Sequence, residues 1–321
     1  MTDVSDSRLS SANVQRVREG LLHWFREVQR DLPWRRTRDP YAILVSEVML
    51  QQTQVDRVLP YYARFLEAFP TAHDLANAQV ADVIKLWSGL GYNRRAVNLQ
   101  RAAQVVVADY GGVFPDDPET LRTLPGLGPY TAGAVAAFAF EQDVAFLDTN
   151  MRRVVTRVVF GVEGAPEREV LAAAQALLPP GHGWEWNQAL IEFGALQCTA
   201  RKPACIVCPL SSQCAAFPLI QSSLIMPKPR QRPIERFETS SRYYRGRIVE
   251  SLRELPAGEA EGISLSNLGP KLRDDFSDAD LPWLASLVQG LRRDGLAAVA
   301  EDRAGYDVGQ DLTLDSRIRL P

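Results

Sequence analysis

All four cysteines of the chain lie in one short segment, and this clustering constrains the fold more than any other feature of the sequence. Cys198, Cys205, Cys208 and Cys214 follow the spacing C-x6-C-x2-C-x5-C, and the 321 residues contain no other cysteine. Four thiolates that fold onto one point make a tetrahedral sulfur site, which suits an iron–sulfur cluster or a zinc ion. We therefore expect a compact loop around a metal centre.

The composition is that of an ordinary globular protein, with 46% hydrophobic and 23% charged residues. The length allows two or three domains. No apolar run approaches the roughly 20 residues that cross a bilayer, and the first residues lack the basic-then-apolar pattern of a signal peptide. We expect a cytoplasmic protein without membrane contact, in which clustered cysteines bind a metal rather than form disulfides.

The net charge of −3 gives no sign of nucleic-acid binding, but the charges are unevenly distributed. Residues 201–247 carry nine Lys or Arg side chains against Glu235 and Glu238, and the chain beyond is rich in acids. A basic stretch is usually a solvated face, and phosphate binding is the alternative.

Apolar residues recur at helical spacing through most of the chain, and almost no stretch alternates with the period of a strand. The pattern predicts a mainly α protein up to about residue 215, followed by a linker rich in Pro, Ser and Arg between about 216 and 240. Helices are expected over residues 12–29, 41–52, 55–68, 79–87, 93–109, 117–123, 130–139, 148–160, 167–177 and 185–196.

The last 80 or so residues have a different pattern. Residues 241–254 and 282–294 suit helices, and the stretches that begin at Gly295 and Gly305 suit two short strands joined by a turn. Helices followed by a small hairpin resemble a winged-helix-like α+β module. Such a module binds DNA or a partner protein, or serves only as a packing appendage.

A glycine-rich turn, Leu124-Pro125-Gly126-Leu127-Gly128, precedes the helix expected to begin near Tyr130. Glycine lets the backbone turn tightly and approach another surface closely. Amides at such a turn and at the following helix N-terminus can bind a phosphate without reading sequence, and the turn's carbonyls can bind a monovalent cation. A single Gly-x-Gly is more often just a helix cap, but the longer string LPGLGPYTA resembles the helix-hairpin-helix of DNA glycosylases.

The order of several motifs resembles that of MutY-type adenine DNA glycosylases over about residues 10–218. The most specific of them is SEVMLQQTQV at 46–55. The others are Trp34-Arg35, WSGLGYN at 87–93, the hairpin, LDTNMRR at 147–153 and the cysteine loop.

This resemblance implies a helix-hairpin-helix DNA glycosylase fold and a [4Fe–4S] cluster on the four cysteines. The implied domains are an iron–sulfur domain (residues 1–30 and 141–218) and a six-helix barrel domain with the hairpin (31–140). A linker (219–240) and the winged-helix-like module (241–321) complete the chain.

Two acids are the candidates for the chemistry. Cleavage of an N-glycosidic bond needs a proton on the departing base and stabilisation of a sugar cation, which two carboxyl groups in different environments can divide. Glu47 lies in an otherwise apolar helix, where burial would raise its pKa, and Asp148 opens the next helix after an apolar run. Without the resemblance, Glu47 could be an exposed acid on a helix and Asp148 could serve only as a helix N-cap. The resemblance implies that Glu47 is the catalytic acid and that Asp148 stabilises the sugar cation.

Tyr130 stands where bifunctional relatives carry a lysine, and we include it among the catalytic positions. A Schiff base with the sugar needs an amine, which tyrosine lacks. The sequence therefore predicts a monofunctional glycosylase. The chain's lysines are Lys85, Lys202, Lys228 and Lys271.

The target base must leave the helical stack to reach Glu47, and the resemblance assigns residues to that task. Each could instead be plain helix surface, or core in the case of Leu90. The assignments are Gln52 and Tyr92 as wedges, Thr53 and Leu90 near the opposite base, Gln188 at the flipped base, Arg35 in the pocket, and Gly126 and Gly128 at the DNA backbone.

The resemblance fails at the C-terminus, where typical members carry a Nudix-like domain that reads 8-oxoguanine and this chain has only the short module. Excision of adenine opposite 8-oxoguanine or guanine, by a monomer acting on duplex DNA in the nucleoid, is the first interpretation. A thymine or uracil glycosylase acting opposite guanine is the second. A non-catalytic iron–sulfur protein that binds DNA is the third, and the intact Glu47 and Asp148 argue against it.

Overall fold

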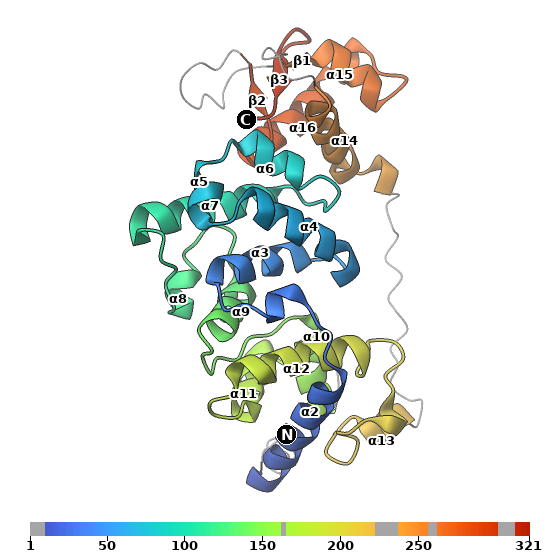
Figure 1. The fold of residues 1–321 in the computed structure, drawn as a ribbon. Helices are drawn as coiled ribbons and strands as arrows, with labels where there is room; N and C mark the ends of the chain where they lie inside the picture. The colour runs from blue at the N-terminus through green and yellow to red at the C-terminus, as the bar shows by residue number, and fades with distance from the viewer. Residues whose placement is uncertain (1–9, 162–164, 222–236, 256–261, 301–311) are drawn as a thin grey trace. The chain divides into compact units, whose positions relative to one another are not determined.

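The computed structural model describes residues 10–161, 165–221, 237–255, 262–300 and 312–321, and most of these are helical (Figure 1). Their contacts divide the chain into two compact units. Unit 1 comprises residues 1–47 and 114–229, and unit 2 comprises residues 48–113 and 230–321. The domain boundaries expected from the sequence stay a prediction.

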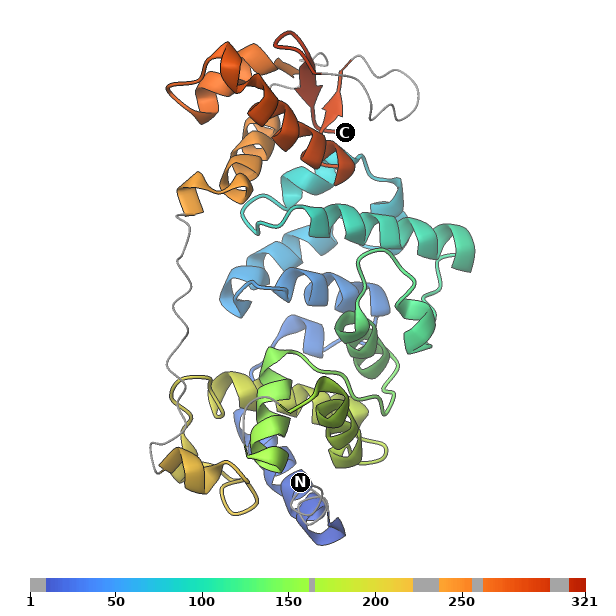
Figure 2. The same ribbon diagram turned by 180° about the vertical axis from the view of Figure 1, so that it is seen from behind.

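Unit 1 is built around one central helix, α12, which packs against α2, α9 and α10 (Figure 2). The apolar face of α2 buries Val17, Leu21 and Phe25, as its helical spacing requires. The elements of unit 1 are α2 (Ser11–Val28), η1 (Pro33–Arg35), most of α3 (Pro40–Leu50), α8 (Pro118–Leu121), α9 (Pro129–Ala139), α10 (Thr149–Val155), the π-helical turn η2 (Thr156–Phe160), α11 (Glu167–Leu177), α12 (Gly183–Leu196), η3 (Cys205–Val207) and α13 (Phe217–Gln221).

Two glycines allow α9 and α12 to approach the chain on either side of Asp148. A Cβ added at Gly133 of α9 would lie 2.7 Å from Cβ of Phe146, and one at Gly194 of α12 would lie 2.7 Å from Cβ of Asn150. Both separations are shorter than a side chain tolerates, so any larger residue would push the helix away. These close approaches fix the segment that carries Asp148 against the core of unit 1.

Unit 2 combines helices from the middle of the chain with the C-terminal module. Its small sheet has the order β1-β3-β2 with antiparallel neighbours, and Ile318 pairs with Ile263 on one side and Val299 on the other. The elements are α4 (Val55–Ala68), α5 (Ala72–Asn77), α6 (Val80–Leu86), α7 (Arg94–Tyr110), η4 (Phe237–Thr239), α14 (Ser241–Arg253), β1 (Ile263–Ser264), α15 (Leu265–Leu272), η5 (Asp278–Asp280), α16 (Leu281–Arg293), β2 (Ala298–Val299) and β3 (Arg317–Arg319).

One hydrophobic core joins the C-terminal module to α6 and α7. Ile84 and Val97 from these two helices belong to the same buried cluster as Ile248 of α14 and Leu291 of α16. Each such side chain contributes roughly 1.5–3 kcal/mol when it is fully buried. The module is therefore packed onto α6 and α7 through its core, within unit 2.

The mainly α fold with a small α+β module at the C-terminus is confirmed. The helices α5, α13 and α15 and the strands β1 and β3 were missed. Helices α5 and α13 have only six and five residues, and α15 contains Gly269 and Pro270, which normally break helices. The strand expected from Gly305 lies outside the described residues, and the described partner of β2 is β3.

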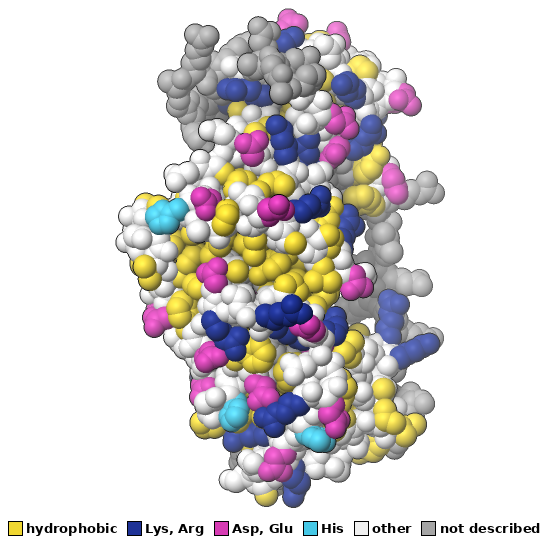
Figure 3. Space-filling model, in the orientation of Figure 1, with side chains coloured by type: hydrophobic (Ala, Val, Ile, Leu, Met, Phe, Trp, Pro, Cys, Tyr) yellow, Lys and Arg dark blue, Asp and Glu magenta, His cyan; other side chains and the backbone are white. Residues whose placement is uncertain are grey.

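Lys and Arg side chains mingle with Asp and Glu over the face shown in Figure 3, in agreement with a net charge near zero. Among the described helices, none is both long enough and apolar enough to cross a membrane.

Candidate active site and metal centre

Glu47 is buried in α3 and hydrogen-bonded to a second predicted site residue. Its side chain lies in an almost wholly apolar helix and is only 5% exposed, and the hydroxyl of Tyr130 donates a hydrogen bond of 3.0 Å to its Oε2. Burial raises the pKa of Glu47 to about 7, and the charge of Asp148 adds to the rise, while the Tyr130 hydrogen bond and the charge of Arg35 oppose it. Near neutral pH the carboxyl group is thus protonated in a large fraction of molecules.

Tyr130 holds the Glu47 carboxyl in place through its hydroxyl group. Its ring packs edge-on against Phe146, with centroids 5.3 Å apart. Burial and then the charge of Glu47 raise the pKa of Tyr130 well above its ordinary value, so the phenol is neutral and acts as a donor.

Asp148 is the N-cap of α10 and at the same time close enough to Glu47 to affect its pKa. The amide of Met151 donates 2.6 Å to Oδ1 of Asp148, and Nδ2 of Asn150 donates 3.4 Å to Oδ2. Burial raises the pKa of Asp148, while these hydrogen bonds and the charge of Arg153 oppose the rise. Capping and a position beside the buried acid are therefore compatible.

Arg35 and Gln188 form one buried network with Glu192, an acid that the sequence did not single out. Nε of Arg35 donates 2.8 Å to Oε1 of Gln188, and Nη2 donates 3.0 Å to Oε2 of Glu192. Arg30 adds hydrogen bonds of 2.8 and 2.7 Å to the two oxygens of Glu192. Burial alone would raise the pKa of Glu192, but the two arginines outweigh it and lower the pKa to about 2.

Glu192 could have been found by the argument that selected Glu47, because it is an acid among apolar residues of a helix. The side chain has no exposed surface, so its ionised form depends entirely on Arg30 and Arg35.

The glycine-rich turn leads into α9 as the sequence predicts. Gly126 has a φ of 82°, which only glycine adopts readily, and Gly128 is the N-cap that precedes Pro129. A Cβ at Gly128 would meet nothing within 4 Å, so the backbone there faces open space.

The predicted wedge residues lie in unit 2 and share a strained backbone. Gln52 has a φ of 56° and Tyr92 a φ of 47°, and Glu141 is the one other described residue besides glycines with a positive φ. Such conformations cost about 1–3 kcal/mol and persist only where the surroundings enforce them. Tyr92 is 41% exposed.

Arg95 enforces both turns and was missed by the sequence analysis. Its Nη1 donates to the carbonyls of Val48, Met49 and Gln51 at 2.7–3.0 Å, and its Nη2 donates to Oγ1 of Thr53 at 3.3 Å and to the carbonyl of Leu90 at 3.2 Å.

One guanidinium therefore joins the turn that contains Thr53 to the turn that contains Leu90. From the sequence, these two residues were related only by their predicted position near the opposite base. Burial lowers the pKa of Arg95 to about 10, so it is still charged at neutral pH and complements the carbonyl end of α3. The one available signal was the pair of arginines, Arg94 and Arg95, that follows the Gly-Tyr-Asn turn.

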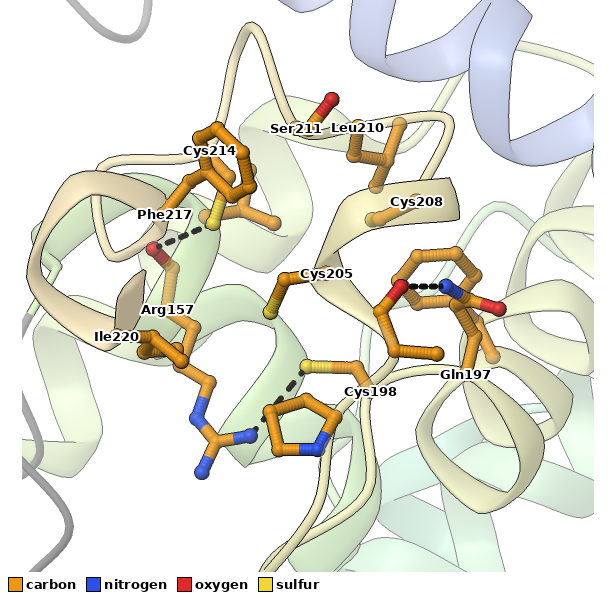
Figure 4. Close-up of a pocket in the computed structure, with 14 residues that line it drawn as sticks. Arg157, Gln197, Cys198, Cys205, Cys208, Leu210, Ser211, Cys214, Phe217 and Ile220 are labelled. Carbon is orange, nitrogen blue, oxygen red and sulfur yellow. Dashed lines mark hydrogen bonds between the residues drawn. The ribbon is translucent and has the colours of Figure 1, made fainter. Parts of the chain in front are cut away.

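The four cysteines line one cavity in unit 1 (Figure 4). They face it together with the apolar side chains of Leu210, Phe217 and Ile220. In the part of the chain that the structure describes, no group of three or more His, Cys, Asp or Glu side chains is placed to hold one metal ion by itself. A single zinc needs all four sulfurs at about 2.3 Å, whereas a cluster fills the space between them with its own iron and sulfide. The four sulfurs around one largely apolar cavity are the donor set that a cluster requires.

The surroundings of the sulfurs also fit a cluster. Burial raises the pKa of the Cys208 and Cys214 thiols to about 11, so they become thiolates only beside strong positive charge such as iron. Nη1 of Arg157 lies 3.6 Å from Sγ of Cys198, where it can donate a hydrogen bond to a thiolate (Figure 4).

Two arginines that the sequence analysis passed over tie the cysteine loop to the helical segment that begins at Asp148. Arg153 donates 2.8 Å to the carbonyl of Cys198 and 2.6 Å to that of Gly194. Arg157 donates 2.8 Å to the carbonyl of Thr199. Their spacing of four residues on one helical face was the available signal. The loop and Asp148 are thus held to the same segment of chain.

Family models match two parts of the chain. Residues 45–180 match the HhH-GPD superfamily of base excision DNA repair proteins, and residues 198–214 match the iron–sulfur binding domain of endonuclease III. The first match contains Glu47, Tyr130, Asp148 and the glycine-rich turn, and the second begins and ends at the outer cysteines. The fold and site define a helix-hairpin-helix DNA glycosylase with an iron–sulfur cluster.

Relatives define the family more narrowly. The chain is 44% identical over 240 residues to the adenine DNA glycosylase of Mycolicibacterium smegmatis, which covers 73% of this chain and 79% of that protein. It is 41% identical over 246 residues to the adenine DNA glycosylase of Mus musculus, of which it spans only 47%. The chain belongs to the adenine DNA glycosylase family.

A solved structure, that of a thermostable thymine-DNA glycosylase, is similar to this chain with a TM-score of 0.61 and 32% identity. The similarity covers 65% of this chain and 100% of that one. The glycosylase fold is therefore shared beyond adenine DNA glycosylases.

We expect Glu192→Ala to lower the free energy of unfolding by about 3–5 kcal/mol, because it leaves Arg35 buried without its carboxylate partner. Urea unfolding at pH 7 measures the change. Glu185→Ala is the matched control, because its partner Arg26 is more than half exposed and water replaces the lost contact, so the change should cost less than about 1 kcal/mol. Equal losses in the two variants would contradict the role of the buried network.

We expect Glu47→Gln to be more stable than the wild type at pH 8 and similar to it near pH 4.5. The folded state raises the pKa of Glu47 from 4.5 to about 7, so the wild type loses stability as the pH rises through this window, while the neutral amide does not. The shift corresponds to roughly 3 kcal/mol. Urea unfolding at both pH values measures it, with the exposed Glu67→Gln as control. A stability gap that does not change with pH would refute the burial of an ionisable Glu47.

Proposed function

We propose that this chain is a monofunctional DNA glycosylase that hydrolyses the N-glycosidic bond of adenine mispaired with 8-oxoguanine or guanine in duplex DNA. The observation that carries the proposal is the buried, Tyr130-bonded Glu47 with its pKa near 7, in a chain that belongs to the adenine DNA glycosylase family.

Glu47 is the general acid. An acid works best when its pKa is near the operating pH, because it is then protonated often enough and still releases its proton readily. In the proposed reaction the Glu47 carboxyl protonates the departing adenine and, once ionised, helps to orient and activate the water that attacks the sugar. The Tyr130 hydroxyl positions the carboxyl throughout.

Asp148 stabilises the sugar cation that forms as the bond breaks. Hydrogen bonds from Met151 and Asn150 favour its carboxylate form and hold it in one orientation. Two carboxyl groups in unlike environments can divide the acid and the electrostatic work between them.

The absence of an amine at position 130 makes the enzyme monofunctional. A lyase reaction proceeds through a Schiff base between an amine and the sugar, and the Tyr130 phenol cannot form one. The chain should therefore stop at the abasic product.

The pocket for the flipped base uses Arg35 and Gln188. The guanidinium of Arg35 only donates, so the oxygen of the Gln188 amide must face it, and the amide nitrogen is the end that would contact the base. Glu192 then acts as a positioning residue, since it holds Arg35.

The turns held by Arg95 carry the residues that act on the duplex. Gln52 and Tyr92 enter the stack as wedges, and Thr53 and Leu90 lie near the opposite base. Their strained backbone conformations are kept by Arg95, which supplies the rigidity that a wedge needs.

The turn at Gly126 and Gly128 would bind a backbone phosphate, with a monovalent cation at its carbonyls. The open space beside Gly128 supports this, because a phosphate can approach the backbone there without meeting a side chain. The enzyme would act as a monomer on nucleoid DNA, with the iron–sulfur, barrel, linker and winged-helix-like domains divided as the sequence predicts.

The four cysteines would hold a [4Fe–4S] cluster whose role is structural. The bound cluster supplies positive charge and cross-links to the loop, and none of the proposed chemistry passes through it. The loop then holds the exposed Arg201 and Lys202 for contact with DNA phosphates.

Excision of thymine or uracil opposite guanine is the second candidate function, and the similarity to a thymine-DNA glycosylase structure favours it. The MLQQTQV segment and the sequence relatives favour adenine.

We expect the purified chain to release adenine from duplexes with A opposite 8-oxoguanine or guanine, and to leave T·G and U·G duplexes intact. Abasic product is scored after alkali under single-turnover conditions, and the rate should fall above about pH 7 as Glu47 ionises. Glu47→Gln should lower the rate by about a hundredfold or more.

Two results would contradict this assignment. Cleavage that survives Glu47→Gln would show that another group is the acid, and cleavage confined to T·G or U·G would establish the second function. Borohydride added during the reaction should trap little enzyme–DNA adduct, and abundant adduct would exclude the monofunctional mechanism.

We expect about four iron atoms and four sulfides per chain after expression with ample iron, as a [4Fe–4S] cluster requires. Metal and sulfide analysis measures this, and Cys208→Ser should lower both values. Ser211→Ala is the control, because Ser211 lines the cavity without a thiol. One zinc per chain and no sulfide would overturn the cluster.

A further inference from the structure

Within unit 2, a basic pocket lies between the start of α7 and the C-terminal module. We call it the α7–α14 pocket; it measures about 580 Å³ and contains four arginines, Arg94 and Arg95 from α7 and Arg242 and Arg245 from α14. Asp294 is the one acid in its lining. A concave site with a net positive charge concentrates anions more strongly than the same charges spread over a flat surface.

Part of this positive charge stays available to a ligand. Asp294 pairs with Arg245 and lies 3.5 Å from Arg94, so one carboxylate serves two guanidinium groups. Arg242 rests on the ring of Tyr92, 4.1 Å from its centroid, and within the described residues no carboxylate forms an ion pair with it.

The pocket adjoins the wedge at Tyr92, which itself belongs to the lining. Tyr92 is 41% exposed, and Arg95 binds the carbonyls of Leu90 and Gly91 in the turn that leads to it. Arg94 follows Tyr92 by two residues in the chain, and the guanidinium of Arg242 lies over the Tyr92 ring. A duplex that contacts Tyr92 would therefore bring its phosphates close to both arginines.

The C-terminal module is held firmly enough for its arginines to form a preorganised site. Nη2 of Arg253 donates 3.0 Å to the carbonyl of Ile84 and 2.9 Å to Oδ1 of Asn93, and the shared core with Ile84 and Val97 lies beside these bonds. Preorganised donors bind an anion without the cost of ordering mobile side chains.

We propose that the α7–α14 pocket binds a phosphate of the DNA backbone next to Tyr92, which makes the C-terminal module part of the DNA-binding surface. This inference rests on the proposed function for its ligand. DNA is the anion already expected beside Tyr92, so the proposal needs no other partner. An acidic protein segment would be a different occupant of the same pocket.

The test measures duplex binding by the full chain with Glu47→Gln, so that binding is read without base excision. Arg242→Ala and Arg94→Ala are compared with Arg247→Ala, a loss of the same charge from α14 outside the pocket, where Arg247 donates to the Lys271 carbonyl. Fluorescence anisotropy at several salt concentrations gives Kd and its salt dependence, and thermal unfolding verifies that each variant is folded.

We expect each pocket variant to weaken binding about fivefold or more and to lower the slope of log K against log salt by about 1, as the loss of one phosphate contact requires. Arg242→Lys should restore most of the slope. If both pocket variants match Arg247→Ala in Kd and slope, the pocket does not bind DNA and the proposal falls. Failure of the unsubstituted chain to excise any base would refute the proposed function instead, while the binding result still decides the pocket.

Discussion

The burial of one carboxyl group, Glu47, is the constraint on which the candidate active site of unit 1 depends. A carboxylate in an apolar helix is unstable unless it is protonated or hydrogen-bonded, and here the Tyr130 hydroxyl, the charge of Arg35 and the carboxyl of Asp148 share control of its ionisation. Each of those groups needs its own support. Phe146 packs on Tyr130, the start of α10 orients Asp148, and Glu192 with Arg30 holds Arg35. The groups that control the ionisation of Glu47 are therefore each held in place by a further contact, and all of them are needed because the Glu47 carboxyl is buried.

Arginines connect the parts of each unit that carry the proposed function. In unit 1, Arg153 and Arg157 bind carbonyls of the cysteine loop from the segment that begins at Asp148, so a loop ordered by its cluster would also support the carboxyl group proposed to stabilise the sugar cation. In unit 2, Arg95 joins the two strained turns. Arginine suits this task because its planar group carries five donors in a fixed geometry and stays charged when buried.

The sequence alone indicated much of the candidate site because the relevant signals are local. The cysteine spacing, the acid within an apolar helix and the glycine-rich turn each occupy a short stretch, and each was found where the sequence placed it. The networks were missed for the opposite reason. The apolar helix around Glu192 indicated that this acid is buried, but neither its partner Arg35 nor the partners of Arg95 could be identified, since they are 157 and up to 47 positions away. The module's sheet was only partly predicted, because strands of two or three residues leave almost no periodic pattern.

By itself, the sequence determined the family, and it predicted the metal ligands, the two acids and the lack of an amine at Tyr130, because these depend on residue type and order along the chain. Only the tertiary structure decided which groups meet. It brought the Tyr130 hydroxyl to Glu47 across 83 positions, committed Arg35 to Gln188 and Glu192, and packed the C-terminal module onto α6 and α7 so that four arginines surround one pocket. The physical reason is that pKa values, ion pairs and pockets depend on burial and distance in space, which the topology of the folded chain sets.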